Sequence, residues 1–161
     1  MQAQSSNPAP VVIGGASHAV DAREIETTLA GQQRAWNAGE PLRESDFTAH
    51  SDYVTFDGTT LHGLDANQRL HNALARGVLR GSQLSGQIQR IRFITNEVAV
   101  VHSIGNLKLR FHRQPKPGRN SVQTTVMRRT AEGWKIETFH NTRIRRRGLV
   151  ARLMVRLANR L

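Results

Sequence analysis

Two histidines on expected β-strands are the side chains of this sequence best suited to proton transfer. His102 lies in the middle of a strand predicted over residues 98–109, and His140 lies near the end of a strand predicted over residues 134–143. Because an unperturbed imidazole titrates near neutral pH, either side chain could donate a proton to a substrate or accept one. The alternatives are structural: His102 could be a buried histidine bonded to a neighbouring strand or a second subunit, and His140 could simply close its strand.

Strand alternation separates His140 from its neighbour Asn141. Adjacent residues of a strand point to opposite faces of the sheet, so only one of the two can enter a site directly. His140 shares its side with Trp134 and Ile136, which are both apolar. This pattern predicts that His140 points inward, and Asn141 remains a candidate for orienting the substrate.

The order of the predicted elements determines where these side chains can lie. Residues 1–19 are rich in small and polar residues and lack periodicity, which predicts a disordered lead-in. A helix is expected from a capping pattern at Asp21 to a glycine stop at Gly39. A short second helix is expected from Pro41 to Ser51.

The chain then changes to β periodicity. Asp57 and Gly58 separate two β-prone runs, which is the strongest short-range signal for a hairpin. A third helix is expected from Asp65 to Gly81. Residues 82–143 then read as four long antiparallel strands.

The apolar residues of the first long strand change sides. Leu84 and Ile88 share one parity, whereas Ile91 and Phe93 share the other. All four can face the core only if one residue is inserted near Gln89 or Arg90, so the sequence predicts a β-bulge there. A bulge bends a sheet, and a strongly curved sheet wrapped around helices leaves room for a pocket between them.

Five segments, in this order, resemble the SgcJ/EcaC family, which belongs to the SnoaL-like branch of the nuclear transport factor 2-like superfamily. They span residues 20–143 and read Ala35-Trp36-Asn37-Ala38-Gly39-Glu40, Asp52 to Gly58, Val98 to His102, Ser121 to Thr124, and Gly133-Trp134 with Phe139-His140-Asn141-Thr142-Arg143. The resemblance implies a cone-shaped α+β fold, in which a strongly curved antiparallel sheet wraps around three N-terminal helices. It also implies a homodimeric small-molecule pocket protein, similar to tailoring proteins of polyketide and enediyne pathways.

The resemblance suggests further site residues. In ketosteroid isomerase-like members of the superfamily, an aspartate on an early strand is the general base and a tyrosine helps to hold the oxyanion. Asp52 and Tyr53 match that pair by residue type, although Asp52 could instead cap a turn and Tyr53 could be ordinary core. The expected substrate contacts are Trp36, Tyr53, Phe56, His71 and Asn141. Trp36 could equally belong to the core, and His71 could be a half-exposed helix residue.

The sequence predicts neither a metal nor an organic cofactor. The family carries an oxidoreductase label, yet the chain has no glycine fingerprint for a dinucleotide. Its seven histidines show no metal-binding spacing, and the lack of cysteine excludes thiolate sites, disulfides and a cysteine nucleophile. A cytoplasmic location is expected, because no apolar run is long enough to span a membrane or to act as a signal peptide.

Basic residues are concentrated near the C-terminus. The 161 residues carry a net charge of +11, from 23 basic and 12 acidic side chains. Residues 143–161 hold seven arginines and no acid, and without them 16 basic residues face 12 acidic ones. Residues 144–161 combine an apolar stripe with arginines one turn apart, which predicts a basic amphipathic helix. It could pack on the domain or on a second subunit, or contact an anionic membrane, nucleic acid or an acidic partner.

Two functions are therefore expected as alternatives. The first is a soluble homodimer that binds a small, largely apolar metabolite and catalyses an isomerisation, cyclisation or dehydration without a cofactor. In that case His102, His140 or Asp52 moves the proton. The second is a non-catalytic protein that binds a ligand or recognises a partner through its basic tail. Two or more titratable groups that converge in a cavity would favour chemistry, and a purely apolar cavity would favour binding.

Overall fold

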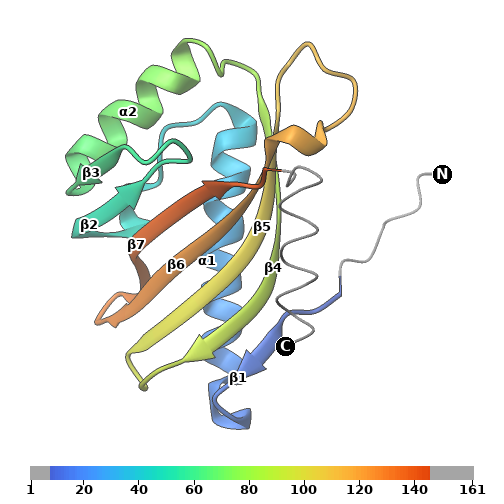
Figure 1. The fold of residues 1–161 in the computed structure, drawn as a ribbon. Coiled ribbons are helices and arrows are strands. Elements are labelled where there is room, and N and C mark those ends of the chain that lie inside the picture. Colours follow the sequence, from blue (N-terminus) through green and yellow to red (C-terminus); the bar gives the residue numbers. More distant parts are fainter. Residues whose placement is uncertain (1–7, 146–161) are drawn as a thin grey trace, which may run out of the picture.

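The structure is a computed structural model that describes residues 8–145. Within them, two α-helices pack on a seven-stranded sheet (Figure 1). The helix α1 (Ala19–Ala38) contacts β4 and β7, and α2 (Leu64–Arg76) contacts β2 and β3. The strands are β1 (Val11–Ile13), β2 (Phe47–Val54), β3 (Thr60–His62), β4 (Gln83–Phe93), β5 (Val98–Lys108), β6 (Asn120–Thr130) and β7 (Gly133–Arg143); single 3-10 turns lie at Ala16–His18, Glu44–Asp46 and Pro117–Arg119.

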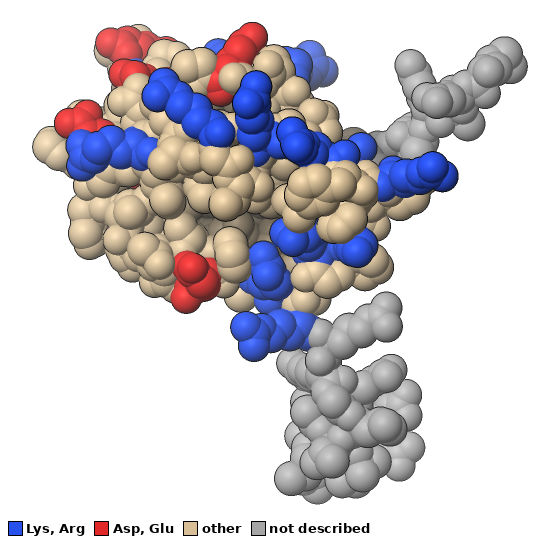
Figure 2. All heavy atoms as spheres, turned by 90° about the horizontal axis from the view of Figure 1, so that it is seen from above, with Lys and Arg blue, Asp and Glu red and all other residues tan. Residues whose placement is uncertain are grey.

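The sheet has the order β1-β4-β5-β6-β7-β2-β3. The long strands β4 to β7 are antiparallel to one another, whereas β1 pairs parallel with β4 and β2 pairs parallel with β7. Figure 1 shows these strands bending around α1, and Figure 2 views the molecule from the end at which β4 and β6 begin. The predicted cone-shaped α+β class is confirmed, with a mixed sheet in place of a wholly antiparallel one.

The predicted bulge lies in β4. The pairing of β4 with β5 shifts register between Ile88 and Arg90, so that Gln89 is the inserted residue. Ile91 is fully buried and Ile88 packs against the same core from the other side of the insertion. The change of parity in the apolar residues therefore located the bend of the sheet correctly.

A second bulge lies in β7, and the sequence analysis missed it. Val126 pairs with Thr138 but Met127 pairs with Ile136, which leaves Glu137 as the extra residue. The alternation of sides changes at this point, so Ile136 and Asn141 face the helices while His140 is exposed on the opposite face. The prediction that His140 points inward was wrong, because it assumed unbroken alternation from Ile136 onward.

The apolar core lies between α1 and one half of the sheet. Ile25 of α1 is fully buried there, and Gly31 leaves room for the side chain of Arg43. The sheet contributes the buried residues Phe47, Ile91, Phe93, Ala99, Val101, Met127, Trp134 and Ile136. Gly39 ends α1 with φ at 74°, and its N–H donates to the Trp36 carbonyl, as the predicted glycine stop requires.

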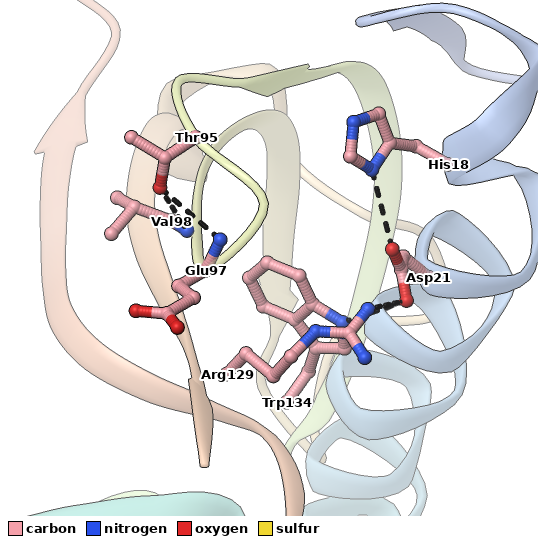
Figure 3. Close-up of polar contacts among 7 residues, drawn as sticks. All are labelled: His18, Asp21, Thr95, Glu97, Val98, Arg129 and Trp134. Atoms are coloured by element: carbon pink, nitrogen blue, oxygen red, sulfur yellow. Dashed lines mark hydrogen bonds and ion pairs between the residues drawn. The ribbon is translucent and has the colours of Figure 1, made fainter.

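A polar network fastens the first turn of α1 to the sheet (Figure 3). The Asp21 carboxylate accepts hydrogen bonds from the Trp134 indole N–H at 3.3 Å and from Nδ1 of His18 at 3.2 Å, and it pairs with Arg129. Burial alone would raise the pKa of Asp21, but the bonds from Trp134, His18 and Arg129 outweigh it and the pKa is lowered. Asp21 and Glu24 thus tie α1 to β6 and β7 rather than capping the helix, since Glu24 accepts the backbone N–H of Trp134 at 2.9 Å.

Local hydrogen bonds hold two turns between strands, and the first of these turns was predicted. The hairpin around Asp57 and Gly58 joins β2 to β3, with the Thr55 N–H donating to the Thr59 carbonyl at 2.9 Å. The turn between β4 and β5 is held by Thr95, whose hydroxyl accepts the backbone N–H groups of residues 97 and 98 (Figure 3). Such turns are local hydrogen-bonded motifs, which explains why a short sequence signal predicted the turn at Asp57 and Gly58.

Two N-terminal predictions need correction. The expected helix over residues 41–51 is only one 3-10 turn, because β2 already begins at Phe47 and pairs with β7. Within the expected lead-in of residues 1–19, Val11–Ile13 forms β1 on the edge of the sheet beside β4. The predicted basic helix falls almost wholly outside the described residues, which end at Arg145. Within residues 8–145, no helix has the length and apolar character to cross a membrane.

Candidate functional site

The face of the sheet that the helices cover changes from apolar to polar along the strands. One row of paired residues marks the change: Ile91, Val101, Thr125, Phe139 and Tyr53 lie side by side across β4, β5, β6, β7 and β2. On one side of this row lies the apolar core. On the other side the same strands present Ser103, Gln123 and Asn141, which pair in register. The polar half of this face is the candidate site.

Four aromatic side chains from four different elements meet beside this row. His71 of α2 lies edge-on to Tyr53 of β2, with 4.9 Å between the ring centroids and 86° between the planes. The ring of Tyr53 also stacks on Phe139 of β7, again with 4.9 Å between the centroids. Trp36, near the end of α1, meets His71 at 6.0 Å and donates its indole N–H to the Ser82 hydroxyl. The four rings therefore form one cluster that only the packing of α1, α2, β2 and β7 brings together.

The hydrogen bonding of His71 decides which of its ring nitrogens can react. Nδ1 donates to the backbone carbonyl of Asn67 at 2.9 Å, one helical turn earlier. This bond leaves the lone pair on Nε2 when the ring is neutral. Burial lowers the pKa of His71, and the bond to the Asn67 carbonyl opposes that shift without cancelling it. His71 is therefore neutral near pH 7, with Nε2 ready to accept a proton.

Burial shifts the pKa of Tyr53 in the opposite direction. Burial raises the pKa of its phenol far above the ordinary value. The phenol therefore stays protonated and can donate a hydrogen bond at any physiological pH. Part of its surface nevertheless remains accessible to solvent, as it does for Trp36, His71 and Asn141. A proton acceptor and a proton donor thus adjoin each other in partly accessible surroundings.

Several buried polar atoms near these rings lack a hydrogen-bond partner among the described residues. Asn67, which is 1% exposed, has neither its amide nitrogen nor its amide oxygen paired. The hydroxyls of Ser51 and Thr125 and the amide oxygen of Asn141 are in the same situation. Each such group costs about 1–3 kcal/mol if it stays unpaired, so these atoms are positioned to bond a ligand or water.

The structure brings together only part of the predicted site. Trp36, Tyr53, His71 and Asn141 belong to this cluster, which is called the Tyr53–His71 cluster below. Asn67, Thr125, Ser51, Ser103 and Gln123 were missed by the sequence analysis. For Asn67 a signal existed, because it lies four residues before His71 and thus on the same side of α2.

The three residues predicted to move the proton lie elsewhere. His102 and His140 are exposed on the outer face of the sheet, in one row with Thr124 between them. His102 points outward because adjacent strand residues face opposite sides, and its neighbour Val101 is fully buried on the inner face. Asp52 is also on the outer face, where its carboxylate pairs with Nδ1 of His62 at 2.8 Å.

The predicted contact residue Phe56 lies in the connection between β2 and β3. It is 48% exposed, and the guanidinium of Arg143 lies over its ring, 4.0 Å from the centroid. Such a cation–π pair covers one face of the phenyl ring. Phe56 is therefore not part of the Tyr53–His71 cluster.

A shallow hollow of about 260 Å³ lies at the other end of β2. Its wall consists of Phe47, Thr48, Ala49, Arg128, Thr130, Ala131, Glu132 and Lys135. Its charged side chains are already engaged, because Lys135 pairs with Glu132 and Arg128 pairs with Glu137. The hollow offers no neutral acid–base pair, so the Tyr53–His71 cluster is the stronger candidate. Among the described residues, no group of three or more side chains has the composition of a metal site.

Comparison with known proteins identifies the fold. No family model matches the chain, and no curated protein matches it either. A solved domain of unknown function with a cystatin-like fold from Nostoc punctiforme is 25% identical, with a TM-score of 0.74, and the match covers 89% of this chain and 88% of that one. An NTF-2-like protein of unknown function from Shewanella oneidensis is 20% identical, with a TM-score of 0.64, over 74% of this chain and 97% of that one.

A putative scytalone dehydratase from Novosphingobium aromaticivorans has the same fold. It is 15% identical, with a TM-score of 0.60, and the match covers 80% of this chain and 91% of that one. At this identity the likeness concerns the fold alone. The chain thus has an NTF2-like, cystatin-like α+β fold.

Proposed function

We propose that this protein binds an uncharged, ring-shaped metabolite with polar substituents and moves a proton on it without a cofactor. The supporting observation is the contact between neutral His71 and protonated Tyr53 in the polar half of the inner face. The residues of the cluster carry no formal charge, which favours an uncharged ligand over an ionic one. The flat rings of Trp36, Tyr53 and Phe139 suit a planar or cyclic ligand.

The proposed reaction uses only these side chains. Nε2 of His71 takes a proton from a carbon beside a carbonyl group, and the C–H electron pair passes into the developing enolate. The Tyr53 hydroxyl donates a hydrogen bond to the enolate oxygen, which stabilises its charge in a site of low dielectric constant. The proton then returns from His71 to another carbon, which gives an isomer, or to a departing hydroxyl, which gives water and an alkene.

The finer assignment rests on the resemblance and on the fold. The segments between Ala35 and Arg143 resemble the SgcJ/EcaC family, which suggests a role in tailoring a polyketide-like metabolite. The likeness of the fold to a putative scytalone dehydratase supports the same class of dehydration or isomerisation. A cytoplasmic location stays a prediction.

A homodimer is part of the proposal. Ile104 and Val122 pair on the outer face of β5 and β6 and are 40% and 43% exposed. Together with His102 and His140 they form a central patch that a second copy could cover. Analytical ultracentrifugation should show a dimer that Ile104→Glu converts to a monomer, whereas Ile94→Glu, at the exposed turn after β4, should leave the dimer intact. A monomeric wild-type protein would contradict this part.

The catalytic part can be tested without the natural substrate. In D2O, the protein should accelerate exchange of the α-carbon protons of 1-tetralone, an uncharged bicyclic ketone, as followed by NMR. His71→Gln and Tyr53→Phe should each lower the exchange rate at least about a hundredfold, because one removes the base and the other the donor. His102→Gln is the matched control and should retain the wild-type rate.

The same experiment separates the two functions that the sequence left open. Ketone binding without accelerated exchange would support a non-catalytic binding protein. Loss of exchange in His102→Gln but not in His71→Gln would show that the proposed site is wrong.

A further inference from the structure

Three segments far apart in the sequence meet at the end of the sheet where β4 and β6 begin. Gln83 at the start of β4 pairs with Lys108 at the end of β5, and Ser121 at the start of β6 pairs with Arg143 at the end of β7. The connections that precede or follow these strands, residues 76–82, 108–119 and 143–145, therefore lie together. This end of the molecule, called the basic end below, is the one that faces the viewer in Figure 2.

The basic end carries a one-sided charge. Its three segments contain nine basic residues and no acidic one. They are Arg76, Arg80, Lys108, Arg110, Arg113, Lys116, Arg119, Arg143 and Arg145. Figure 2 shows the Lys and Arg side chains spread across this end, with Asp and Glu side chains toward its margins. Within residues 8–145, none of the nine forms an ion pair. The charge is thus available to an anionic partner.

Large apolar side chains project from the same end. Val78, between α2 and β4, is 78% exposed, and Phe111, between β5 and β6, is 69% exposed. The two turns touch, since a side-chain carbon built on Gly81 would lie 3.5 Å from Cβ of Arg110. Val78 and Phe111 therefore lie on two touching turns that also carry basic residues.

We propose that the basic end docks on a bilayer that contains anionic phospholipids. Val78 and Phe111 enter the boundary between headgroups and acyl chains, and the surrounding arginines and lysines contact the lipid phosphates. Surface-binding proteins combine these two features, because shallow apolar insertion and charge attraction add to each other. The sequence after Arg145 continues with five more arginines and no acid, so its charge has the same sign.

A single-stranded nucleic acid fits the observations less well. Its bases stack on flat aromatic faces, but Val78 and Ile144 are aliphatic, and Arg143 already covers one face of Phe56. Lipid acyl chains accept aliphatic and aromatic groups equally. The mixture of Val, Ile and Phe at this end thus favours a membrane surface.

The test measures co-sedimentation of the full-length protein with lipid vesicles. Wild type should bind vesicles of phosphatidylcholine mixed with phosphatidylglycerol, and should bind pure phosphatidylcholine vesicles much more weakly. Val78→Ser/Phe111→Ser should lower the partition coefficient at least about tenfold, because it removes the inserted surface. Val20→Ser, at an equally exposed valine in the first turn of α1, is the matched control and should bind as wild type does.

A second pair of variants tests the charge. Arg113→Glu should lower binding to the mixed vesicles at least about fivefold, whereas Arg23→Glu, the same charge change on α1, should have little effect. All five positions changed in these variants are exposed, so thermal melting should be unchanged. Equal binding by wild type and both basic-end variants would overturn the proposal, as would displacement of the vesicles by a single-stranded RNA homopolymer. The measurement needs no ligand, so its result is independent of the Tyr53–His71 proposal.

Discussion

The imidazole of His71 stands almost perpendicular to the ring of Tyr53, although the two residues come from a helix and a strand. The main chain of α2 orients the imidazole through the Asn67 carbonyl, and the ring of Phe139 stacks on that of Tyr53. This arrangement holds an imidazole that can accept a proton beside a phenol that can donate a hydrogen bond before any ligand binds. Such preorganisation is what general acid–base catalysis requires.

The pH dependence of proton exchange should reveal His71. Burial lowers the pKa of this imidazole below its ordinary value of 6.5, so the neutral base persists to lower pH than it does in a free histidine. The exchange rate should be constant at high pH and should reach half of that value only below pH 6.5, as the imidazole takes up a proton. NMR measurement of the rate against pH checks this. An acidic limb centred above the ordinary histidine pKa would contradict the assignment.

Replacement of Asn67 should separate stability from ligand binding. Its buried amide has no partner among the described residues, so Asn67→Leu removes an unpaired polar group and should raise the free energy of unfolding by about 1 kcal/mol. The same change should weaken binding of 1-tetralone, because a hydrogen-bonding group is lost. Urea unfolding and ligand titration by NMR measure the two effects. Asn72→Leu on the same helix is the control, and a destabilised Asn67→Leu protein that binds normally would show that Asn67 is structural.

Replacement of Asp21 should make stability less dependent on pH. The pKa of this carboxyl is lowered in the folded state, so its contribution is present above about pH 4 and is lost as the pH falls through the folded value. Asp21→Asn should therefore lower the free energy of unfolding by about 1 kcal/mol at pH 7. The effect is small because partial exposure to solvent screens the ion pair with Arg129. The difference from wild type should shrink at about pH 3. Urea unfolding at both pH values tests this, with Glu26→Gln on the same helix as control; an equal difference at both would refute it.

Deletion of Gln89 should show what the bulge in β4 does. Without this residue, the part of β4 that contains Ile88 would turn its apolar side chains away from the core or lose its pairing with β5. The deletion should lower the free energy of unfolding by about 3 kcal/mol, the contribution of one or two buried aliphatic side chains. Gln89→Ala keeps the extra residue and should be nearly as stable as wild type in urea unfolding. If the deletion were equally harmless, the bulge would have no role in the packing.

Local patterns predicted much of the fold because their causes are local. The Asp57-Gly58 turn and the Gly39 stop each depend on a few adjacent residues. The bulge at Gln89 could be inferred because apolar residues on both sides of it had to reach one core. The bulge at Glu137 left a weaker signal of the same kind, because a single apolar residue, Phe139, departs from the parity of Trp134 and Ile136, and the inward side of His140 was therefore predicted wrongly. The strand that begins at Phe47 was missed because its pairing with β7 spans most of the chain.

The sequence by itself determined the fold class, the four long strands and a set of polar and aromatic residues from which the candidate site is drawn. Only the tertiary structure decided that Tyr53, His71 and Asn67 share one region while His102 and Asp52 lie on the outer face, and that nine dispersed basic residues gather at one end. The physical reason is that composition and periodicity are read along the chain. The side of a strand, in contrast, depends on register and bulges, and proximity depends on how distant strands pair.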